Sequence, residues 1–348
     1  MADVNTPQVS VLLSCYNGSQ WIRESIQSVL DQTYRDFEFI IVDDGSTDDS
    51  LDIINDFAKR DRRIRVIEKN NTGLADSLNV GLENARSAWI ARIDADDICE
   101  PNRLKKQIDI VNRYPGLVFL GSAISLIDDK GDNVGVYKYP TRHNSLLNNL
   151  RSLGRFPAHS SAFIRANVMR SVGGYRVRFE RSQDWDLWLR LSEKGRLMSL
   201  SEPLVRVRKH SQQISHKELG KSQVIYSRIA TISYWLRRWG YSDPIEYREG
   251  EYERFYNWVA SRLSGEQVFD YLYYISESKK MVRQLGGSPE CFVGSVFYIL
   301  SEKRYLLRFM LSRLFGESIS RRLAGEWIEN NRLEKIKLRW NDDKNREI

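Results

Sequence analysis

The stretch WIARIDADDICEP, residues 89–101, places Asp94, Asp96 and Asp97 at the end of an apolar run. An acidic turn after a strand is ordinarily solvated, because aspartate side chains bond nearby backbone amides. Carboxylates held close together repel one another unless a cation lies between them, and their oxygens suit Mg²⁺ or Mn²⁺. The stretch therefore indicates either a turn or a cation site.

Two other predicted strands, VSVLLSCYN and FEFIIVDD, also end in polar residues. In an open parallel sheet the carboxyl ends of the strands meet at one edge, and ligands bind there. The polar residues expected at that edge, beside Asp94 and Asp96, are Ser14, Tyr16, Asn17, Asp43 and Asp44. Together they predict an acidic rim that a divalent cation would neutralise, with substrate phosphates and water completing the coordination shell of the ion.

Strands and helices are predicted to alternate around this rim. VSVLLSCYN, FEFIIVDD, IRVIEKN and AWIARID have the composition of strands, and segments with helical spacing separate them. This order indicates an α/β fold with a mostly parallel sheet and helices on both faces. Mixed strands and helices continue to about residue 208, and the pattern after residue 217 is nearly all helical. We therefore expect two parts, residues 1–215 and 216–348.

Composition and known motifs exclude several classes of protein. The 348 residues are 41% hydrophobic and 28% charged, as in globular chains. Cys15, Cys99 and Cys291 are too widely spaced for a zinc or disulfide framework and suit a reducing compartment. The sequence has no P-loop and no dinucleotide fingerprint, which argues against ATPases, kinases and dehydrogenases. Because no signal peptide or long apolar run is present, we expect a cytoplasmic protein.

The C-terminal region combines basic and aromatic residues. Of the net charge of +7, roughly +5 lies after residue 220. Such helices suit the surface of an anionic bilayer, here the inner face of the cell membrane. A helical subdomain packed on the first domain and a dimer contact are the alternatives. Nucleic acid is not expected as a partner, because acidic residues interrupt the basic ones and the predicted cleft is acidic.

An ordered set of motifs resembles family 2 glycosyltransferases of the GT-A fold, which is Rossmann-like. The matching segments, between about residues 8 and 215, are VSVLLSCYN, IQSVLDQTYRDFEFIIVDDGSTDDS, NTGLADSLNVGLENA, WIARIDADD, HSSAFIR, GGY and QDWDLWLRL. The resemblance implies transfer of a sugar from a nucleotide donor, with a UDP-sugar expected, and inversion at the anomeric carbon. It implies Mn²⁺ or Mg²⁺ as the cofactor. The implied acceptor is a glycan or lipid-linked saccharide in bacterial surface polysaccharide synthesis.

The resemblance also assigns donor-side roles to individual residues. Asp44 is expected to contact the nucleobase, with Ser14 and Tyr16 beside the base or the ribose. Asp94 is expected to face the ribose, and Asp96 to bind the metal ion.

Two further residues near the diphosphate have alternative roles. Arg92 matches the arginine of the family's R-x-D-x-D-D and either faces the diphosphate or forms a salt bridge to a rim aspartate. His210, in VRVRKHSQQIS, is similar to the family's R-x-H segment. It either completes the metal or diphosphate site or is a loop residue without a ligand.

Inversion by single displacement needs a general base on the acceptor hydroxyl, and a carboxylate is sufficient. The resemblance favours Asp184, at the start of a helix predicted near Gln183, whereas propensity alone makes Asp184 or Asp186 a helix cap. The family often has Glu where this chain has Gln183, so Asp184 is expected to act alone. His159 and Trp185 are further candidates on the acceptor side, against structural roles for both.

A second class of function is a non-catalytic subunit that binds sugar nucleotides or glycans. Such a subunit predicts the loss of the acidic rim or of the base, and both are present in this sequence. Hydrolysis of a nucleotide sugar with and without Mn²⁺ would separate the two classes.

Overall fold

The protein consists of a mixed α/β unit followed by a helical unit. The structure is a computed structural model, and the residues that it describes are 6–210, 221–263 and 316–331. The chain divides into two compact units, residues 1–226 and residues 227–348. The boundary predicted between residues 215 and 216 falls outside the described residues and stays a prediction.

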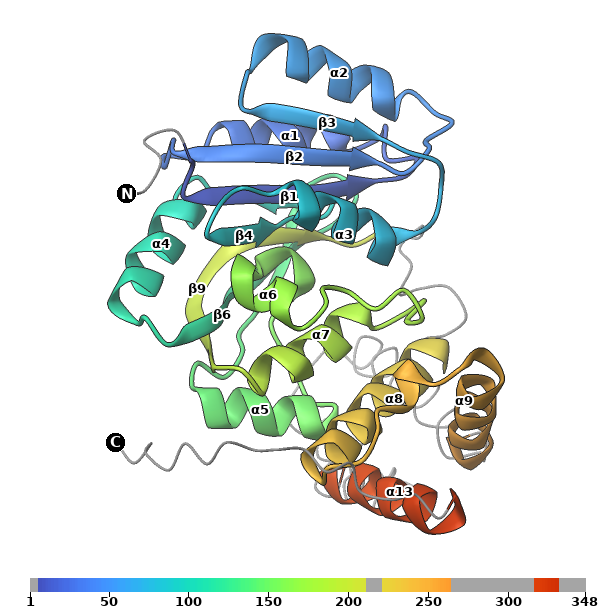
Figure 1. The fold of residues 1–348 in the computed structure, drawn as a ribbon. Helices are drawn as coiled ribbons and strands as arrows, with labels where there is room; N and C mark the ends of the chain where they lie inside the picture. Colours follow the sequence, from blue (N-terminus) through green and yellow to red (C-terminus); the bar gives the residue numbers. More distant parts are fainter. Residues whose placement is uncertain (1–5, 211–220, 264–315, 332–348) are drawn as a thin grey trace, which may run out of the picture. The chain divides into compact units, whose positions relative to one another are not determined.

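Four parallel strands form the first half of the sheet, as their Val-rich and Ile-rich sequences predict (Figure 1). They are β1 (Val9–Cys15), β2 (Phe37–Asp43), β3 (Ile64–Glu68) and β4 (Trp89–Arg92). β1 lies between β2 and β4, and β3 pairs with the other side of β2. The register places Cys15 beside Asp43 and Leu12 beside Arg92. The strand ends that carry the predicted rim therefore share one edge.

The second half of the sheet is mixed. Its strands are β5 (Ile98–Cys99), β6 (Leu117–Ile127), β7 (Asn133–Tyr137), β8 (Phe163–Arg165) and β9 (Arg196–Arg208). β8 runs antiparallel between β4 and β6, β9 runs parallel to β6, and β5 and β7 add antiparallel pairs. The order through the sheet is β3-β2-β1-β4-β8-β6-β9-β5. The sequence did not predict β5, which is too short for a periodic pattern.

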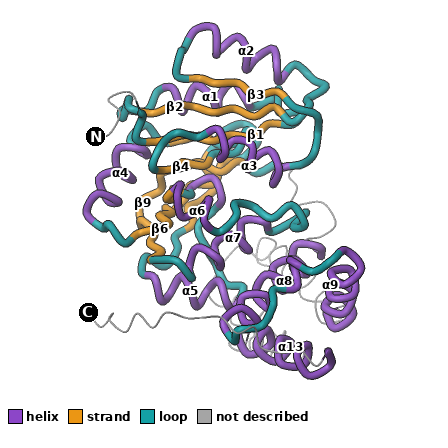
Figure 2. Tube along the Cα trace, in the orientation of Figure 1, coloured by secondary structure: helices purple, strands orange, loops and turns teal. Residues whose placement is uncertain are grey.

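Helices cover both faces of the sheet (Figures 1 and 2). α1 (Ile22–Leu30), α2 (Ser50–Arg60) and α4 (Arg103–Arg113) share one apolar core with alternate residues of β1 and β2. α3 (Leu74–Asn84) packs on the opposite face, where Gly81 lies against Leu12. A Cβ at Gly81 would lie 2.1 Å from Leu12 Cδ1, so glycine permits this close approach.

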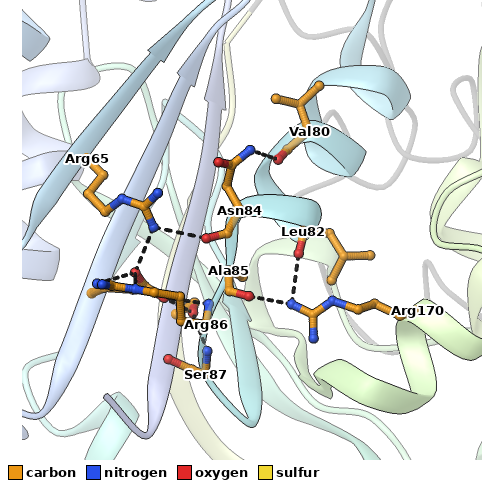
Figure 3. Close-up of polar contacts among 10 residues, drawn as sticks. Arg65, Val80, Leu82, Asn84, Ala85, Arg86, Ser87 and Arg170 are labelled. Carbon is orange, nitrogen blue, oxygen red and sulfur yellow. Dashed lines mark hydrogen bonds and ion pairs between the residues drawn. The ribbon is translucent and has the colours of Figure 1, made fainter. Parts of the chain in front are cut away.

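Glu38 forms a polar cluster at the amino ends of β1 and β2. Two members of the cluster, Arg65 and Arg86, are labelled in Figure 3. Ser10 Oγ donates to it at 2.7 Å, Arg86 Nε at 2.9 Å and Arg65 Nη1 at 3.1 Å. Burial opposes ionisation, but these bonds together hold the pKa of Glu38 below its ordinary value. The cluster fixes the end of the sheet that lies away from the predicted rim.

Two arginines near this polar cluster restrain the C-terminal end of α3 (Figure 3). Arg65 Nη1 donates to the Asn84 carbonyl at 2.9 Å. Arg170, in α6 (Ala166–Ser171), donates to the carbonyls of Leu82 and Ala85. Carbonyls at a helix end have no partner within the helix, so these arginines supply one.

The remaining elements of the first unit carry the acceptor-side candidates. They are α5 (His143–Ser152), the 3₁₀ turn η1 (His159–Ser161) and α7 (Gln183–Ser192). α5, β8, α7 and β9 agree with the mixed strands and helices expected up to about residue 208, but the sequence did not predict α6 as a separate helix.

The second unit is helical where the structure describes it, as the sequence predicts. Its elements are α8 (Lys221–Arg238), which begins in the first unit, η3 (Pro244–Glu246), α9 (Glu249–Leu263) and α13 (Gly316–Asn331). The rings of Phe255 and Trp327 lie 4.9 Å apart in its core. Helical patterns expected within residues 264–315 and 332–348 lie outside the described part. Among the described helices, none is both long and apolar enough to cross a bilayer.

Candidate active site

Asp94 follows β4, and its neighbours fix the direction of its carboxylate. Arg92 Nη2 donates to Asp94 Oδ1, and Ser160 Oγ donates to Oδ2 at 2.5 Å. The Asp94 N–H in turn donates to Ser160 Oγ at 3.1 Å. Burial opposes ionisation, but the Arg92 charge and the Ser160 hydroxyl help to hold the pKa of Asp94 below its ordinary value. Asp94 is therefore a fixed, ionised carboxylate.

Arg92 is 1% exposed and forms the salt bridge to a rim aspartate that was one of its two predicted roles. Its Nε and Nη1 atoms are buried and have no hydrogen-bond partner in the described part of the chain. The Arg92 charge also acts on the pKa values of His159, Tyr175 and Asp184. These side chains therefore share its surroundings. A contact between Arg92 and a diphosphate stays a prediction.

Asp96 and His210, the two predicted metal ligands, lie together. His210 Nε2 is 2.8 Å from Asp96 Oδ2. The Trp21 ring packs on the imidazole with 4.0 Å between centroids, and His210 Nδ1 is buried without a partner among the described residues. Burial and the neighbouring Asp94 raise the pKa of Asp96. A nearby cation would relieve this repulsion.

Arg208 fixes the turn that carries Asp96. Its Nε donates to the Asp96 carbonyl at 3.1 Å, and its backbone N–H donates to Asp97 Oδ1 at 2.9 Å. It also donates to the Asp128 carbonyl at 3.2 Å and pairs with Glu24. Asp97 is 3% exposed, and burial with the charges of its neighbours raises its pKa well above the ordinary value. Asp97 therefore belongs to the framework of the turn.

The donor set at Asp96 and His210 fits a divalent cation. A carboxylate oxygen and an imidazole nitrogen are ligands that Mn²⁺ accepts, and Mg²⁺ favours the oxygen. In residues 6–210, 221–263 and 316–331, no three His, Cys, Asp or Glu side chains gather as a complete metal site. These two ligands would leave the other coordination positions to phosphate oxygens and water.

Asp44 holds the loop after β3. Lys69 Nζ donates to Asp44 Oδ1 at 2.6 Å, the Thr72 N–H donates to the same oxygen at 3.0 Å, and the Gly73 N–H donates to Oδ2 at 2.9 Å. Burial opposes ionisation, but these donors outweigh it and lower the pKa of Asp44. Both oxygens are thus already bonded, and the predicted contact with a nucleobase stays a prediction.

Asp43 differs from Asp44 in having an oxygen without a partner. Its Oδ2 accepts from the Ser46 N–H at 3.0 Å, whereas Oδ1 is buried and bonded to no described residue. Nearby, Ser14 is buried and Tyr16 is 54% exposed. The structure thus brings the predicted donor-side residues to the ends of β1 and β2.

Asp184 lies in the first turn of α7, as predicted. The Trp185 N–H donates to Asp184 Oδ1 at 2.8 Å, and Oδ2 has no partner among the described residues. Burial raises the pKa of Asp184 to about 6. A carboxyl group with this pKa is well suited to accept a proton near neutral pH.

Asp186 is a structural residue. It is 0% exposed, and Arg190 donates to its Oδ2 from Nε at 2.9 Å and from Nη2 at 2.7 Å. Arg176 Nη1 lies 3.5 Å from its other oxygen. An enclosed carboxylate paired with two arginines is not available as a general base.

His159 is bonded to Tyr175, which the sequence showed only as part of the GGY motif. His159 Nε2 and the Tyr175 hydroxyl are 2.7 Å apart. Burial and the Arg92 charge lower the pKa of His159 to about 3, so its ring is neutral near neutral pH. His159 is therefore a poor general base.

Trp185 has a structural contact of its own. Its Nε1 donates to the Leu150 carbonyl at 3.1 Å, and its ring meets the edge of Phe156 at 6.3 Å. The side chain is only partly buried, so a contact with an acceptor sugar stays a prediction.

Comparison with known proteins establishes the family. The model of the family described as Glycosyl transferase family 2 matches residues 10–173. An uncharacterized glycosyltransferase of Haemophilus influenzae is 32% identical over 254 residues, which cover 68% of this chain and 76% of that protein. The chain belongs to glycosyltransferase family 2. It is therefore an enzyme of the transferase class, as its sequence predicts.

Solved structures share the GT-A fold of this glycosyltransferase. S. aureus TarS 1-349 in complex with UDP-GlcNAc aligns with a TM-score of 0.55 and 15% identity, covering 93% of this chain and 92% of that chain. The mannosyltransferase PcManGT from Pyrobaculum calidifontis, in complex with GDP-Man and Mn²⁺, aligns with a TM-score of 0.51 and 14% identity, covering 91% and 87%. At these identities the likeness concerns the fold.

Several residues that the structure brings to the candidate site were not predicted to belong to it. They are Lys69, Ser160, Tyr175 and Arg208. Ser160 and Tyr175 lie within motifs that the sequence did show, HSSAFIR and GGY. Lys69 and Arg208 act through tertiary contacts, and nothing in their local sequence indicates which carboxylate or carbonyl each one meets.

Proposed function

We propose that this glycosyltransferase transfers a sugar from a nucleoside-diphosphate donor, a UDP-sugar in the first instance, to a hydroxyl of a glycan or lipid-linked saccharide. The reaction is a single displacement with inversion, and Asp184 is the general base. The observation that carries this proposal is the contrast between two carboxylates, Asp94 and Asp184. Asp94 is held ionised by Arg92, while the half-buried Asp184 has a pKa of about 6 and an oxygen, Oδ2, that no described residue bonds.

Donor binding is proposed at the ends of β1, β2 and β4. Asp44 orders the loop that carries Thr72 and Gly73, so that loop forms a fixed wall for the nucleobase. Ser14 and Tyr16 lie beside the base or ribose, and Asp94 faces the ribose. The fold neighbours that bind UDP-GlcNAc and GDP-Man support a donor of this class.

The divalent cation, Mn²⁺ or Mg²⁺, is proposed at Asp96 and His210. His210 Nε2 and Asp96 Oδ2 are 2.8 Å apart, and His210 Nδ1 has no partner among the residues that the structure describes; both facts fit a site that is completed by the donor. When bound, the ion supplies Lewis-acid stabilisation of the negative charge on the departing diphosphate. Arg208 and Trp21 hold the two ligands in place. The Mn²⁺ in the PcManGT complex supports this assignment.

Asp184 Oδ2 is proposed to accept the proton of the acceptor hydroxyl. Oδ1 is held by the Trp185 N–H, which fixes the orientation of the carboxylate. The two rival groups are unsuited, because Asp186 is enclosed by arginines and His159 has a pKa of about 3. Asp184 is thus the available base among these candidates.

We also propose that the enzyme works in the cytoplasm, at the inner face of the membrane, in polysaccharide synthesis. The support is the basic excess after residue 220 and the aromatic residues there. Binding to anionic liposomes should weaken with salt, because surface charges are screened beyond about 8 Å at physiological ionic strength. Equal recovery with neutral and anionic liposomes would contradict this location.

The test of function is a panel of nucleotide sugars assayed with and without Mn²⁺. The expected result is metal-dependent release of nucleoside diphosphate by the wild-type enzyme, and loss of this release in Asp184→Asn when acceptor is present. NMR of the glycoside product reads the anomeric configuration and so tests inversion. A non-catalytic binding subunit would bind a nucleotide sugar without turnover of any donor in the panel.

A further inference from the structure

The hydrogen bond between Tyr175 and His159 has a defined direction. The Tyr175 side chain is buried, and burial raises the pKa of its hydroxyl, which therefore keeps its proton. Among the described residues, His159 Nε2 is the hydroxyl's hydrogen-bond partner, at 2.7 Å. If Nε2 carried a proton, the hydroxyl proton would be buried without an acceptor, which is costly. Tyr175 is therefore the donor and Nε2 the acceptor.

This direction decides where the imidazole proton lies. Burial and the charge of Arg92 lower the pKa of His159 to about 3, so the ring is neutral and carries one proton. Because Nε2 accepts from Tyr175, that proton is on Nδ1. In the described part of the chain Nδ1 bonds to no residue, and it is not one of the buried polar atoms without a partner. The Nδ1–H group is therefore a hydrogen-bond donor that no described residue uses and that a ligand can reach.

His159 lies near residues of the proposed donor site and near the proposed base. The next residue, Ser160, bonds to Asp94 on the donor side. On the other side, the Tyr175 hydroxyl is close enough for the Asp184 charge to act on its pKa. The His159 ring meets the edge of Trp188 at 5.9 Å, which limits its rotation. His159 therefore lies between the donor and the base.

The backbone of Tyr175 is fixed by α3. The Tyr175 N–H donates to Asn79 Oδ1 at 2.8 Å, and Asn79 Nδ2 donates to the Tyr175 carbonyl at 2.7 Å. Gly174 has φ +63°, and a Cβ there would lie 2.5 Å from Asn79 Oδ1. Only glycine is unstrained at this position. The tyrosine hydroxyl is thus held in place from a helix outside the 3₁₀ turn that carries His159.

We infer that Tyr175 fixes His159 as the Nδ1–H tautomer and that this neutral N–H donates a hydrogen bond to an oxygen of the acceptor sugar. The inference rests on the proposed function for the identity of the ligand, whereas the tautomer stands on the contacts alone. Tyr175 is a positioning residue and His159 selects the acceptor. A neutral donor binds a sugar oxygen without competing with Asp184 for the proton, and an acceptor lacking that oxygen would leave the N–H unpaired.

The tautomer is tested by NMR on the full chain with ¹⁵N-labelled histidine. The His159 signals are assigned from the spectrum of His159→Asn. We expect a protonated Nδ1, an unprotonated Nε2 and no titration between mildly acidic and neutral pH. Tyr175→Phe should show a mixture of both tautomers. A wild-type spectrum with protonated Nε2, or with a ring that titrates near neutral pH, would overturn the inference whatever the enzyme's activity.

The acceptor contact is tested by steady-state kinetics. Tyr175→Phe should lower kcat/KM for the acceptor by about threefold to tenfold, the usual worth of one hydrogen bond, and leave nucleoside-diphosphate affinity unchanged. Tyr34→Phe is the matched control, because its hydroxyl also bonds one side chain, Gln8 at 2.9 Å, on an exposed surface. A Tyr175→Phe enzyme that matches Tyr34→Phe in acceptor kinetics would contradict the contact.

Substitutions of His159 test which nitrogen matters and do not depend on Tyr175. Asparagine carries its N–H near the position of Nδ1, whereas glutamine reaches the position of Nε2. We expect His159→Asn to keep more acceptor kcat/KM than His159→Gln, with equal donor affinity and both variants folded by circular dichroism. The reverse order would overturn the inference. If donor turnover is absent in the wild-type enzyme as well, the proposed function fails, and the NMR result still decides the tautomer.

Discussion

Asp184 and Asp186 lie two residues apart in α7 and have opposite environments. Asp186 is fully enclosed and pairs with Arg190 and Arg176, whereas Asp184 has one oxygen without a partner in the described part of the chain and a pKa raised to about 6 by burial. Helical geometry explains the difference, because positions two apart point in different directions around the helix. One carboxylate therefore serves stability and the other is available for chemistry.

Asp184→Asn should reduce turnover by about 10² to 10⁴, the usual worth of a general base. The substitution keeps the size of the side chain and removes its basicity, so affinity for a nucleoside diphosphate with Mn²⁺ should stay near wild type. A transfer assay beside calorimetry reads both quantities. Transfer at nearly the wild-type rate would show that Asp184 is only part of the helix start.

Asp186→Ala should act on stability, because it removes the carboxylate that pairs with the buried Arg190 and the partly exposed Arg176 and leaves an unfilled space. Breaking a buried ion pair costs about 3 to 5 kcal/mol of unfolding free energy. The matched control is Asp56→Ala, whose partners Lys59 and Arg60 are exposed and whose pairs are worth less than about 1 kcal/mol. Urea denaturation of both variants measures the difference, and equal unfolding free energies would contradict a structural role for Asp186.

The pH dependence of transfer should follow the ionisation of Asp184. Activity should rise as the pH increases through about 6, where the carboxyl loses its proton. The measurement is kcat against pH at saturating donor, metal and acceptor. A flat profile through this range would argue against Asp184 as the base.

Stability should respond to the same group in the opposite sense. The pKa of Asp184 is about 6 in the folded protein against an ordinary value of 3.8, so its contribution is favourable below 3.8 and is lost as the pH rises through about 6. In mildly alkaline buffer the unfolding free energy of Asp184→Asn should therefore exceed that of wild type by an amount on the order of 2 kcal/mol. The variant should accordingly unfold at a higher temperature. The gain should vanish in acid. A variant less stable than wild type in alkaline buffer would contradict this sign.

Asp96→Ala should abolish metal-dependent transfer while the protein stays folded, and chelation of the wild-type protein should do the same. The expected cause is loss of a metal ligand, so Mn²⁺ binding in the presence of a nucleoside diphosphate should weaken in calorimetry. Asp109→Ala, an exposed substitution on α4, is the control for loss of one carboxylate. Full activity in excess chelator would exclude the cation from the reaction.

Asp44→Asn should mainly weaken donor binding, because it disturbs the bonds from Lys69, Thr72 and Gly73 that hold the loop. A contact made equally in the ground and transition states changes affinity more than kcat. Asp43→Asn tests the neighbouring carboxylate, because Asp43 Oδ1 has no partner among the described residues. Calorimetry with nucleosides and nucleoside diphosphates separates base contacts from phosphate contacts. Unchanged affinity in both variants would remove these residues from the donor site.

The elements of the fold were predictable where a segment is long enough to show a period. β1 to β4 and the helices between them have Val-rich or amphipathic patterns, and each reflects burial on a defined face. β5 contains only Ile98 and Cys99, and its pairing with Val205 and Arg206 depends on contacts far away in the sequence. Such short pairs leave no local signal.

The site was predictable as a set of residues but not as a set of contacts. The family motifs indicated Asp184, Asp96 and His210, and the structure places the last two together. The motifs could not show which rim aspartate Arg92 pairs with, or that Tyr175 bonds to His159, because both facts depend on how side chains pack in three dimensions.

α3 connects the proposed donor site to Tyr175, which lies on the proposed acceptor side. Its N-terminus begins at the loop held by Asp44, its middle is bonded to Tyr175 through Asn79, and its C-terminus is held by Arg170. Because the helix is restrained at these three places, a shift of α3 on donor binding would also displace Tyr175. By thermodynamic reciprocity, the acceptor must then change the affinity for the donor by the same factor. The dissociation constant of each substrate would then depend on whether the other is bound.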